Sequence, residues 1–234
     1  MKVFAIIPSG GKGSRTSESV PKQYIKFSNK EMIAYTLDVF QKCEHVDSIV
    51  ISAQQEYFNL LDELKTKYSL TKISNFVIGG DTRQKSVLSA LRSIEADPKD
   101  LIIIHDAARP LLNQDILTKA IKKALFSDNI TVAIKAKDTL ASGDNKIEKY
   151  FNREEIYYIQ TPQIFRYNDL IKAFELAEKE SFYATDESML VRNLGKDVAI
   201  VEGSSLNIKI TTDDDIRLFR LIAEKLFESN NQNI

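Results

Sequence analysis

The sequence predicts an α/β fold built on a mostly parallel β-sheet, with a β-hairpin arm that projects from the domain. Short apolar runs alternate with segments of helical periodicity, a glycine-rich turn follows the first run, and this rhythm changes once, over residues 138–158. Repeated strand–helix order is typical of a parallel sheet with helices on both faces. At 234 residues with 43% hydrophobic content, the chain is long enough for one large domain.

The first strand is predicted over residues 3–7, an almost continuously apolar run, as expected of a strand covered on both faces. Pro8 and the glycines after it end this strand. Further strands are expected at residues 48–52, 75–78, 101–104 and 131–136. Apolar side chains at helical spacing mark the helices between them, around Leu37, Leu61, Leu91 and Ile121.

Residues 138–158 alternate polar and apolar side chains around a turn at residues 143–145 and carry no helical pattern. We interpret this segment as a β-hairpin arm. Because such an arm has little core of its own, we expect it to pack against a partner, and a second copy of the chain is the simplest candidate. The C-terminal part predicts helices over 168–179 and 186–195, strands over 198–201 and 208–210, and a final helix from Asp213.

The composition limits the function classes that the chain can serve. Its 32 basic and 33 acidic residues nearly cancel, so an anion site must arise from local charge, and no nucleic-acid partner is expected. Cys43 cannot form an internal disulfide, and two histidines are too few for a His/Cys cage, so any metal should be a hard, oxygen-bound ion. The first apolar run is too short for a signal peptide or a membrane span, which predicts a cytoplasmic location without membrane association.

The strongest local signal is the loop GGKGSR at residues 10–15, followed by PKQ at residues 21–23. Glycines allow backbone N–H groups to converge on phosphate oxygens, and Arg15 and Lys22 can supply positive charge. The loop is not a Walker motif, which needs Gly-Lys-Ser/Thr, and the dinucleotide fingerprint would need glycine where Thr16 stands. The pattern indicates a triphosphate cradle, with an ordinary glycine-rich turn as the alternative.

A second signal, HDAARP at residues 105–110, directly follows the strand predicted at 101–104. Ligands of open α/β sheets bind at the carboxyl ends of strands, so Asp106 is placed to hold Mg²⁺ against phosphates, with Arg109 nearby for an anion. The alternative is a salt bridge between these two residues that only shapes the turn. His105 lies beside an apolar run and is interpreted as a structural core histidine.

A third signal, GGDTRQKS at residues 79–86, joins a predicted strand to a helix that starts near Arg83. Its glycines allow close approach of a nucleotide base, and the Ser86 hydroxyl could read the polar edge of that base. The alternative is that Asp81 simply caps the helix.

Taken together, these stretches resemble the 2-C-methyl-D-erythritol 4-phosphate cytidylyltransferase family of non-mevalonate isoprenoid synthesis, and the match spans nearly the whole chain. The resemblance rests on the order and spacing of several blocks. They are SGGKGSR at 9–15, PKQY at 21–24, GGDTR at 79–83 with Ser86, HDAARP at 105–110, KDT at 137–139, QTPQ at 160–163, TDE at 185–187 and NIK at 207–209. Ser9, Thr16 and Leu206 depart from the usual alanine, methionine and polar residue, and Leu206 argues against a further polar ligand at that position.

The resemblance implies a single Rossmann-like nucleotidyltransferase domain over residues 1–234, with CTP as donor, Mg²⁺ or another divalent cation, and a polyol-phosphate acceptor. It implies a homodimer whose arms, near residues 137–158, cross so that each completes the other's site. The implied CTP-binding residues are Pro8, Ser9, Gly10, Gly11, Gly13, Gly80, Asp81 and Ser86. The implied acceptor-binding residues are Asp106, which also lies at the metal, Arg109, Thr161, Thr185 and, from the neighbour's arm, Thr139 and Arg153. The predicted catalytic cations are Arg15, Lys22 and Lys209.

The predicted reaction is the transfer of CMP from CTP to 2-C-methyl-D-erythritol 4-phosphate with release of pyrophosphate. The acceptor phosphate is already anionic at neutral pH, so the enzyme needs no general base and acts by alignment and charge stabilisation. Ribitol-5-phosphate cytidylyltransferase is the nearest alternative, but Ala108 and the block at 185–187 favour the isoprenoid family. A catalytically silent nucleotide-binding module is a further alternative, and it would be expected to have lost the cations of the cradle.

Overall fold

The computed structural model describes residues 1–11 and 20–231, and the side chains of residues 1–11 and 20–225. The strands are β1 (Val3–Pro8), β2 (Lys26–Phe27), β3 (Lys30–Glu31), β4 (Ser48–Ala53), β5 (Ile73–Ile78), β6 (Leu101–Ile104), β7 (Ile130–Lys135), β8 (Leu140–Ser142), β9 (Lys149–Phe151), β10 (Tyr157–Arg166) and β11 (Ala199–Glu202). The α-helices are α1 (Met32–Lys42), α2 (Phe58–Lys67), α3 (Arg83–Arg92), α4 (Gln114–Ser127), α5 (Tyr167–Glu180), α6 (Glu187–Asn193) and α7 (Asp213–Asn231). Short 3-10 helices are η1 (Lys22–Tyr24), η2 (Gln55–Tyr57) and η3 (Arg153–Glu155).

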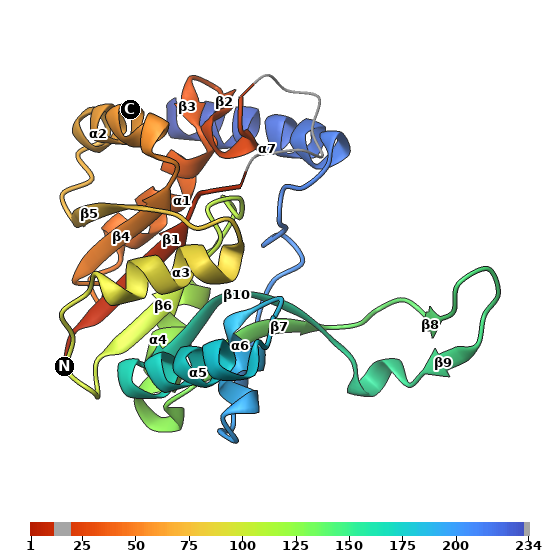
Figure 1. Ribbon diagram of the computed structural model, residues 1–234. Coiled ribbons are helices and arrows are strands. Elements are labelled where there is room, and N and C mark those ends of the chain that lie inside the picture. The colour runs from red at the N-terminus through yellow and green to blue at the C-terminus, as the bar shows by residue number, and fades with distance from the viewer. Residues whose placement is uncertain (12–19, 232–234) are drawn as a thin grey trace.

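The centre of the fold is a seven-stranded sheet in the order β11-β7-β10-β6-β1-β4-β5 (Figure 1). Only β10 runs antiparallel to its neighbours, β6 and β7, and the other strand pairs of this sheet are parallel. This arrangement confirms the predicted α/β fold with a mostly parallel sheet. Among the described residues, none of the helices combines the length and the hydrophobicity that a membrane span requires.

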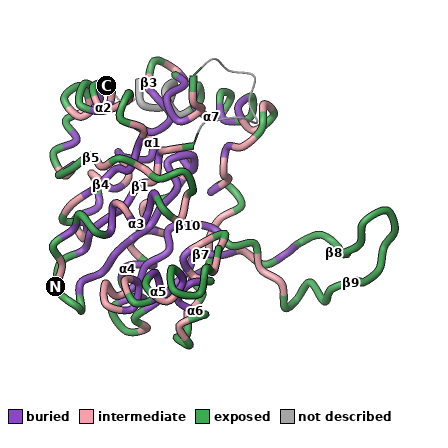
Figure 2. Tube along the Cα trace, viewed as in Figure 1, coloured by how far each residue is buried: buried purple, intermediate pink, exposed green. Residues whose placement is uncertain are grey.

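Both faces of the sheet are covered, as the apolar character of β1 predicts. Ala5 and Ile7 pack with α1, α2 and α4 on one face, whereas Phe4 and Ile6 pack with α3, α5 and α6 on the other. The strand is buried along almost its whole length (Figure 2). Burial of one such side chain stabilises the fold by about 1.5–3 kcal/mol, so the sheet provides a rigid base for the loops at its carboxyl edge.

The strand predicted at residues 208–210 is absent, so that prediction is wrong. The segment is instead fastened to the loop after β6, because the Ile210 backbone N–H donates to the Ala108 carbonyl and the Arg109 side chain donates to the Asn207 carbonyl. These two bonds use groups that a sheet would otherwise pair. They bring Lys209 to the carboxyl end of β6.

β10, which lies in the middle of the sheet, was not predicted from the sequence. Pro162 interrupts its pattern, and its pairing with β7 shifts register between Ile159 and Gln163. Proline and irregular register both argue against a central strand when only the sequence is read. Antiparallel pairing with β6 nevertheless places Thr161 beside the end of that strand.

The predicted hairpin arm is present and projects away from the sheet (Figure 1). β8 and β9 pair antiparallel from Leu140 opposite Phe151 to Ser142 opposite Lys149, so the turn spans residues 143–148 and is longer than predicted. Residues 141–155 are all exposed (Figure 2). An arm with no packed core of its own supports the expectation of a partner surface, and dimer formation through it stays a prediction.

Candidate active site

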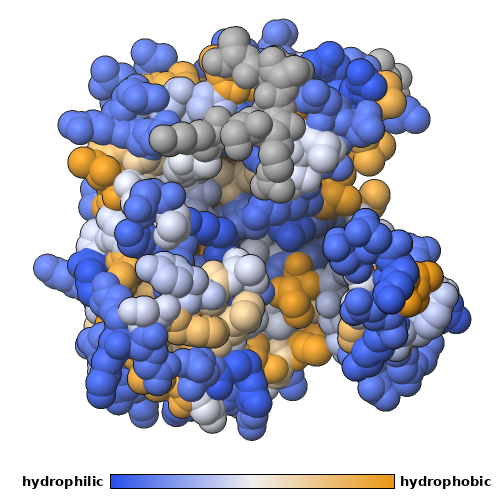
Figure 3. All heavy atoms as spheres, turned by 45° about the vertical axis from the view of Figure 1, so that its right-hand side comes forward, coloured by the Kyte–Doolittle hydropathy of each residue, from blue (hydrophilic) through white to orange (hydrophobic). Residues whose placement is uncertain are grey.

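The carboxyl ends of β1 and β6 border a cavity of about 410 Å³, as expected for an open α/β sheet. We call it the donor cavity, because the predicted CTP-binding residues that the structure describes line it, and it is formed by loops that are far apart in sequence. Figure 3 shows the molecule hollowed on this side, with hydrophilic residues along the hollow. The residues lining the cavity are Pro8, Ser9, Gly10, Gly11, Lys22, Gln23, Gln54, Gly80, Asp81, Thr82, Arg83, Ser86, Asp106, Ala107, Ala108 and Lys209.

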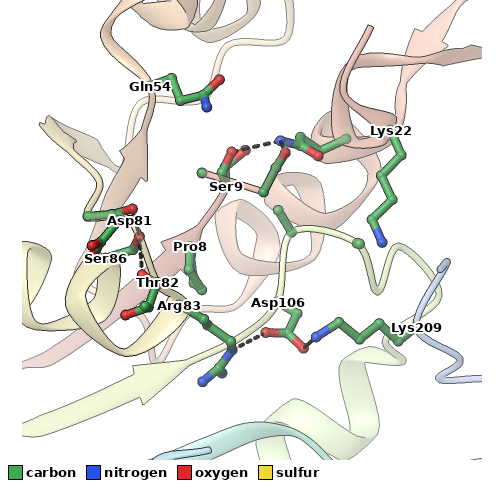
Figure 4. A pocket seen from close by; sticks show the side chains of 16 residues that line it. Pro8, Ser9, Lys22, Gln54, Asp81, Thr82, Arg83, Ser86, Asp106 and Lys209 are labelled. Atoms are coloured by element: carbon green, nitrogen blue, oxygen red, sulfur yellow. Dashed lines mark hydrogen bonds and ion pairs between the residues drawn. The ribbon is translucent and has the colours of Figure 1, made fainter. Parts of the chain in front are cut away.

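The described part of the glycine loop is held by a glutamine that the sequence analysis did not assign. Gln23 Nε2 donates to the carbonyl oxygens of Ser9 at 2.7 Å and Gly11 at 3.0 Å, and the Gln23 side chain is buried. Because the carbonyl and the N–H of one peptide point in opposite directions, the bond to the Ser9 carbonyl turns the Gly10 N–H away from Gln23. The same 3-10 helix carries Lys22, whose side chain extends toward Asp106 and Lys209 (Figure 4).

The loop between β5 and α3 forms the opposite wall of the donor cavity (Figure 4). Gly80 is required there, because a Cβ atom would lie 2.4 Å from Cβ of Lys85. Thr82 caps α3 by accepting from the Lys85 N–H, whereas Asp81 pairs with the Lys85 ammonium group. The alternative in which Asp81 caps the helix is therefore wrong. The Ser86 hydroxyl donates to carbonyls of the same loop, at Gly80 and Thr82.

Asp106 is the point at which the positive charges of the site converge. Its Oδ2 lies 2.8 Å from Nζ of Lys209 and 3.7 Å from Nε of Arg109, and its Oδ1 lies 2.9 Å from Nε of Arg83 (Figure 4). Burial alone would raise the pKa of the Asp106 carboxyl, but these charges, Arg83 foremost, outweigh burial and hold the pKa well below its usual value. The group is a carboxylate throughout the physiological pH range.

His105 lies under the site with no exposed surface. Its Nε2 lies 3.2 Å from the carbonyl oxygen of Arg109, which can only accept, so Nε2 carries the proton and Nδ1 accepts from the Thr161 hydroxyl at 2.9 Å. Thr161 Oγ1 in turn accepts from the Asp106 backbone N–H at 3.2 Å. Burial lowers the pKa of His105 to about 4, so the ring is neutral. These contacts fit the structural role that the sequence analysis gave to this histidine.

A second cavity, of about 390 Å³, lies on the other side of Asp106. We call it the acceptor cavity, because predicted acceptor-binding residues line it. Arg83, Asp106 and Lys209 line both cavities, so these three residues form the wall between them. The remaining residues of the acceptor cavity are Arg109, Ile159, Gln160, Thr161, Gln163, Thr185, Asp186, Ser188 and Met189.

The structure brings most of the sequence-predicted site residues to these two cavities. Lys22, Lys209 and the predicted CTP-binding residues that it describes line the donor cavity, and Asp106, Arg109, Thr161 and Thr185 line the acceptor cavity. Arg15 and Gly13 lie outside the described residues. Thr139 and Arg153 lie on the arm and line neither cavity of their own chain, and Leu206 is two-thirds exposed and lines neither cavity.

The side chains around Asp106 that could act as metal ligands determine what kind of metal site the chain can provide. No group of three or more His, Cys, Asp and Glu side chains that could hold a metal occurs among the described residues. Mg²⁺ commonly takes one or two carboxylates and completes its shell with phosphate oxygens and water. Asp106, a carboxylate beside a cavity lined by a glycine loop, fits that mode, in which the nucleotide supplies the other ligands.

The roles of Gln23, Arg83 and Glu187 were not predicted from the sequence. All three stand within blocks that were singled out, but their partners lie on other segments: Arg83 Nη1 lies 2.7 Å from Oε1 of Glu187. An acidic residue that follows a capping aspartate usually remains solvated at a helix N-terminus. No pattern in the sequence signals that Glu187 is instead buried against an arginine.

Comparison with known proteins identifies the relatives of this chain. Residues 3–225 match the model of the family described as 2-C-methyl-D-erythritol 4-phosphate cytidylyltransferase. A curated protein of that name from Geobacter metallireducens is 41% identical over 232 residues, which cover 97% of this chain and 100% of the relative.

Solved structures give the same result. The 2-C-methyl-D-erythritol 4-phosphate cytidylyltransferase of Francisella tularensis has a TM-score of 0.81 and 31% identity, and the match covers 94% of this chain and 99% of that one. The 4-diphosphocytidyl-2C-methyl-D-erythritol synthase of Anaerococcus prevotii has a TM-score of 0.83 and 27% identity, over 95% and 98% of the two chains.

Proposed function

Because this chain belongs to the 2-C-methyl-D-erythritol 4-phosphate cytidylyltransferase family, we propose that its two adjoining cavities bind CTP and 2-C-methyl-D-erythritol 4-phosphate, one on each side of Asp106. The protein is a transferase that uses CTP in isoprenoid precursor synthesis. The observation that carries the assignment of sites is the wall of Arg83, Asp106 and Lys209 shared by both cavities. Two substrates bound there would meet at the charged groups of the wall.

The reaction joins one acceptor phosphate oxygen to the α-phosphorus of CTP and breaks the bond from that phosphorus to the bridging oxygen of the β-phosphate. The electron pair of the broken bond leaves with pyrophosphate, and no proton has to be removed from the nucleophile. Catalysis then consists of alignment and of offsetting negative charge in the transition state. We assign the charge-stabilising role to Lys22 and Lys209, which line the donor cavity, and to Arg15.

Burial supports Arg109 as a ligand of the acceptor phosphate. The residue is 9% exposed and lines the acceptor cavity. Its Nη1 donates to the Asn207 carbonyl and its Nε lies 3.7 Å from Oδ2 of Asp106, so the guanidinium is held at the edge of this cavity. A fixed positive charge at the cavity wall would attract the acceptor phosphate. Thr161 and Thr185 line the same cavity and are assigned to the same ligand.

A divalent cation is part of this proposal, as is general for nucleotidyltransferases. Asp106 would hold Mg²⁺ together with phosphate oxygens of CTP. When bound, the ion neutralises phosphate charge and so favours departure of pyrophosphate. Lys209 and Arg83 hold the same carboxylate in place for this role.

We further propose a homodimer in which Thr139 and Arg153 of each arm complete the acceptor site of the other subunit. The support is that both residues lie on the exposed arm, apart from the cavities of their own chain. Residues 1–234 then form one nucleotidyltransferase domain with the arm as its dimerisation element. The cytoplasm is the proposed location, and the free thiol of Cys43 is compatible with a reducing compartment.

Pyrophosphate release tests the function directly. The protein is mixed with CTP and Mg²⁺ and then with 2-C-methyl-D-erythritol 4-phosphate or ribitol 5-phosphate at equal concentration. We expect release with the methylated acceptor and a much smaller kcat/KM with ribitol 5-phosphate. A preference for ribitol 5-phosphate would overturn the assigned acceptor, and no release with either would overturn the reaction.

A further inference from the structure

Arg83 forms a charged connection between the donor and acceptor sides of the site. It is the first residue of α3, directly after the loop that walls the donor cavity, and Glu187 is the first residue of α6, directly after Thr185 and Asp186 of the acceptor cavity. Arg83 Nη1 donates to Oε1 and Oε2 of Glu187 at 2.7 and 2.8 Å, and its Nε donates to Oδ1 of Asp106 at 2.9 Å. One guanidinium therefore binds two carboxylates from two other segments.

Burial of the two carboxylates and the planar shape of the guanidinium together fix the direction of these hydrogen bonds. The Glu187 and Asp106 side chains are 1% and 9% exposed, so water competes little for either carboxylate. A guanidinium is planar and presents its N–H groups in a fixed fork, so holding Nη1 on Glu187 fixes the direction of the Nε–H. That direction determines where Oδ1 of Asp106 lies, and Oδ2 then points to Lys209 (Figure 4).

We propose that Arg83, held by Glu187, is a positioning residue that fixes the Asp106 carboxylate between the two cavities. The proposal rests on the proposed function, since it assigns Asp106 to the reacting groups. Without Glu187, Asp106 keeps its charge and its contact with Lys209, but the Arg83 guanidinium that orients Oδ1 is no longer held in one direction. Turnover should suffer more than binding of CTP, because a small displacement of a catalytic group acts mainly on the transition state.

Steady-state kinetics of Glu187→Gln test the idea, because this change keeps the shape of the side chain and removes its charge. We expect kcat to fall by about tenfold or more while the KM for CTP changes by less than about twofold. In an Arg83→Met background the same substitution should have no further effect, because residues that act through one contact are not additive. The double variant Arg83→Met/Glu187→Met leaves no unpaired charge at residue 187, and its thermal unfolding shows whether the fold is kept.

The exposed pair of Arg92 and Glu178 provides a matched control. It also joins α3 to a helix on the same face of the sheet and has an N···O distance of 2.7 Å, but its side chains are 56% and 48% exposed and line neither substrate cavity. Glu178→Gln should leave kcat unchanged. Wild-type kcat in Glu187→Gln, or full additivity with Arg83→Met, would overturn the proposal. Failure of the proposed function is distinct, because wild-type protein would then release no pyrophosphate.

Discussion

The Lys209 ammonium nitrogen lies 2.8 Å from Oδ2 of Asp106, in the wall that separates the donor cavity from the acceptor cavity. The ammonium group has two further N–H donors for substrate phosphates. We expect Lys209→Met to lower kcat about a hundredfold, the typical cost of deleting one group that stabilises transition-state charge. The rate of pyrophosphate release at saturating concentrations of both substrates measures this fall in kcat.

Lys196 gives the control for this substitution. Its Nζ lies 3.2 Å from Oδ1 of the buried Asp169, outside both cavities. Lys196→Met also removes a lysine that pairs with a buried aspartate, so it should affect stability without affecting kcat. Equal kcat values for the two variants would show that Lys209 has no special role in the reaction.

Lys22 is expected to act on the triphosphate. Its side chain extends into the donor cavity from the side opposite Asp81 and Ser86 (Figure 4). Lys22→Ala should lower turnover by about a hundredfold or more. Lys26→Ala is the control, because Lys26 belongs to the neighbouring strand β2 and pairs with Glu31 at 3.5 Å, outside the cavity. Near-normal turnover of Lys22→Ala would remove this residue from the mechanism.

Gln23 should matter through the shape of the glycine loop. Gln23→Leu removes both donors and leaves the carbonyls of the buried Ser9 and the exposed Gly11 without these bonds. We expect the KM for CTP to rise about tenfold, and stability to fall by about 1–3 kcal/mol because the Ser9 carbonyl is buried and loses its donor. Kinetics and urea unfolding measure the two effects. A loss of stability with an unchanged KM for CTP would mean that the loop keeps its shape without Gln23.

The donor cavity illustrates what a sequence alone can predict. Parallel strands end at the same edge of a sheet, so Gly10, Gly80 and Asp106, which each follow a predicted strand, could be placed together from the order of elements. The roles of local groups follow from their types, because glycine allows close approach and carboxylates bind cations. These inferences need no knowledge of how side chains pack.

Other features depend on contacts that sequence patterns do not encode. Arg83 and Glu187 are separated by 104 positions, and their pairing requires the N-terminal ends of α3 and α6 to lie together. The hairpin of β2 and β3 turns through Ser28 and Asn29 at positive φ (46° and 65°), with no glycine to signal it. β10 was not predicted because Pro162 interrupts its sequence pattern. Its place in the sheet depends on pairing with β6 and β7, which the pattern of residues 157–166 does not reveal.

His105 should give the stability of the protein a distinct pH dependence. Burial lowers its pKa to about 4 in the folded protein, whereas an unfolded histidine titrates near 6.5. Between these values the unfolded chain binds more protons, so the free energy of unfolding falls as pH decreases through this window, by about 3 kcal/mol in all. Urea unfolding at a series of pH values measures this slope.

The variant His105→Gln isolates this contribution. Glutamine does not titrate, so the variant should be less stable near pH 7 yet lose less stability than the wild type between pH 6.5 and 4. Taking the difference between the two proteins cancels the carboxylates, including Glu187, whose pKa is raised mainly by burial and which acts in the opposite direction. Identical slopes would mean that folding does not lower the pKa of His105.

Arg153 lies on the arm, where its side chain is 56% exposed and its Nη1 donates to the Lys137 carbonyl at 3.3 Å. If it serves the neighbouring subunit, Arg153→Ala should raise the KM for the acceptor much more than the KM for CTP. Mixed dimers provide the decisive measurement. A subunit with Lys22→Ala paired with one carrying Arg153→Ala contains one site with wild-type Lys22 and wild-type Arg153 only if the arms are exchanged. Activity should then exceed that of either variant alone. Mixing without any recovery would place Arg153 in the site of its own chain, or outside the reaction.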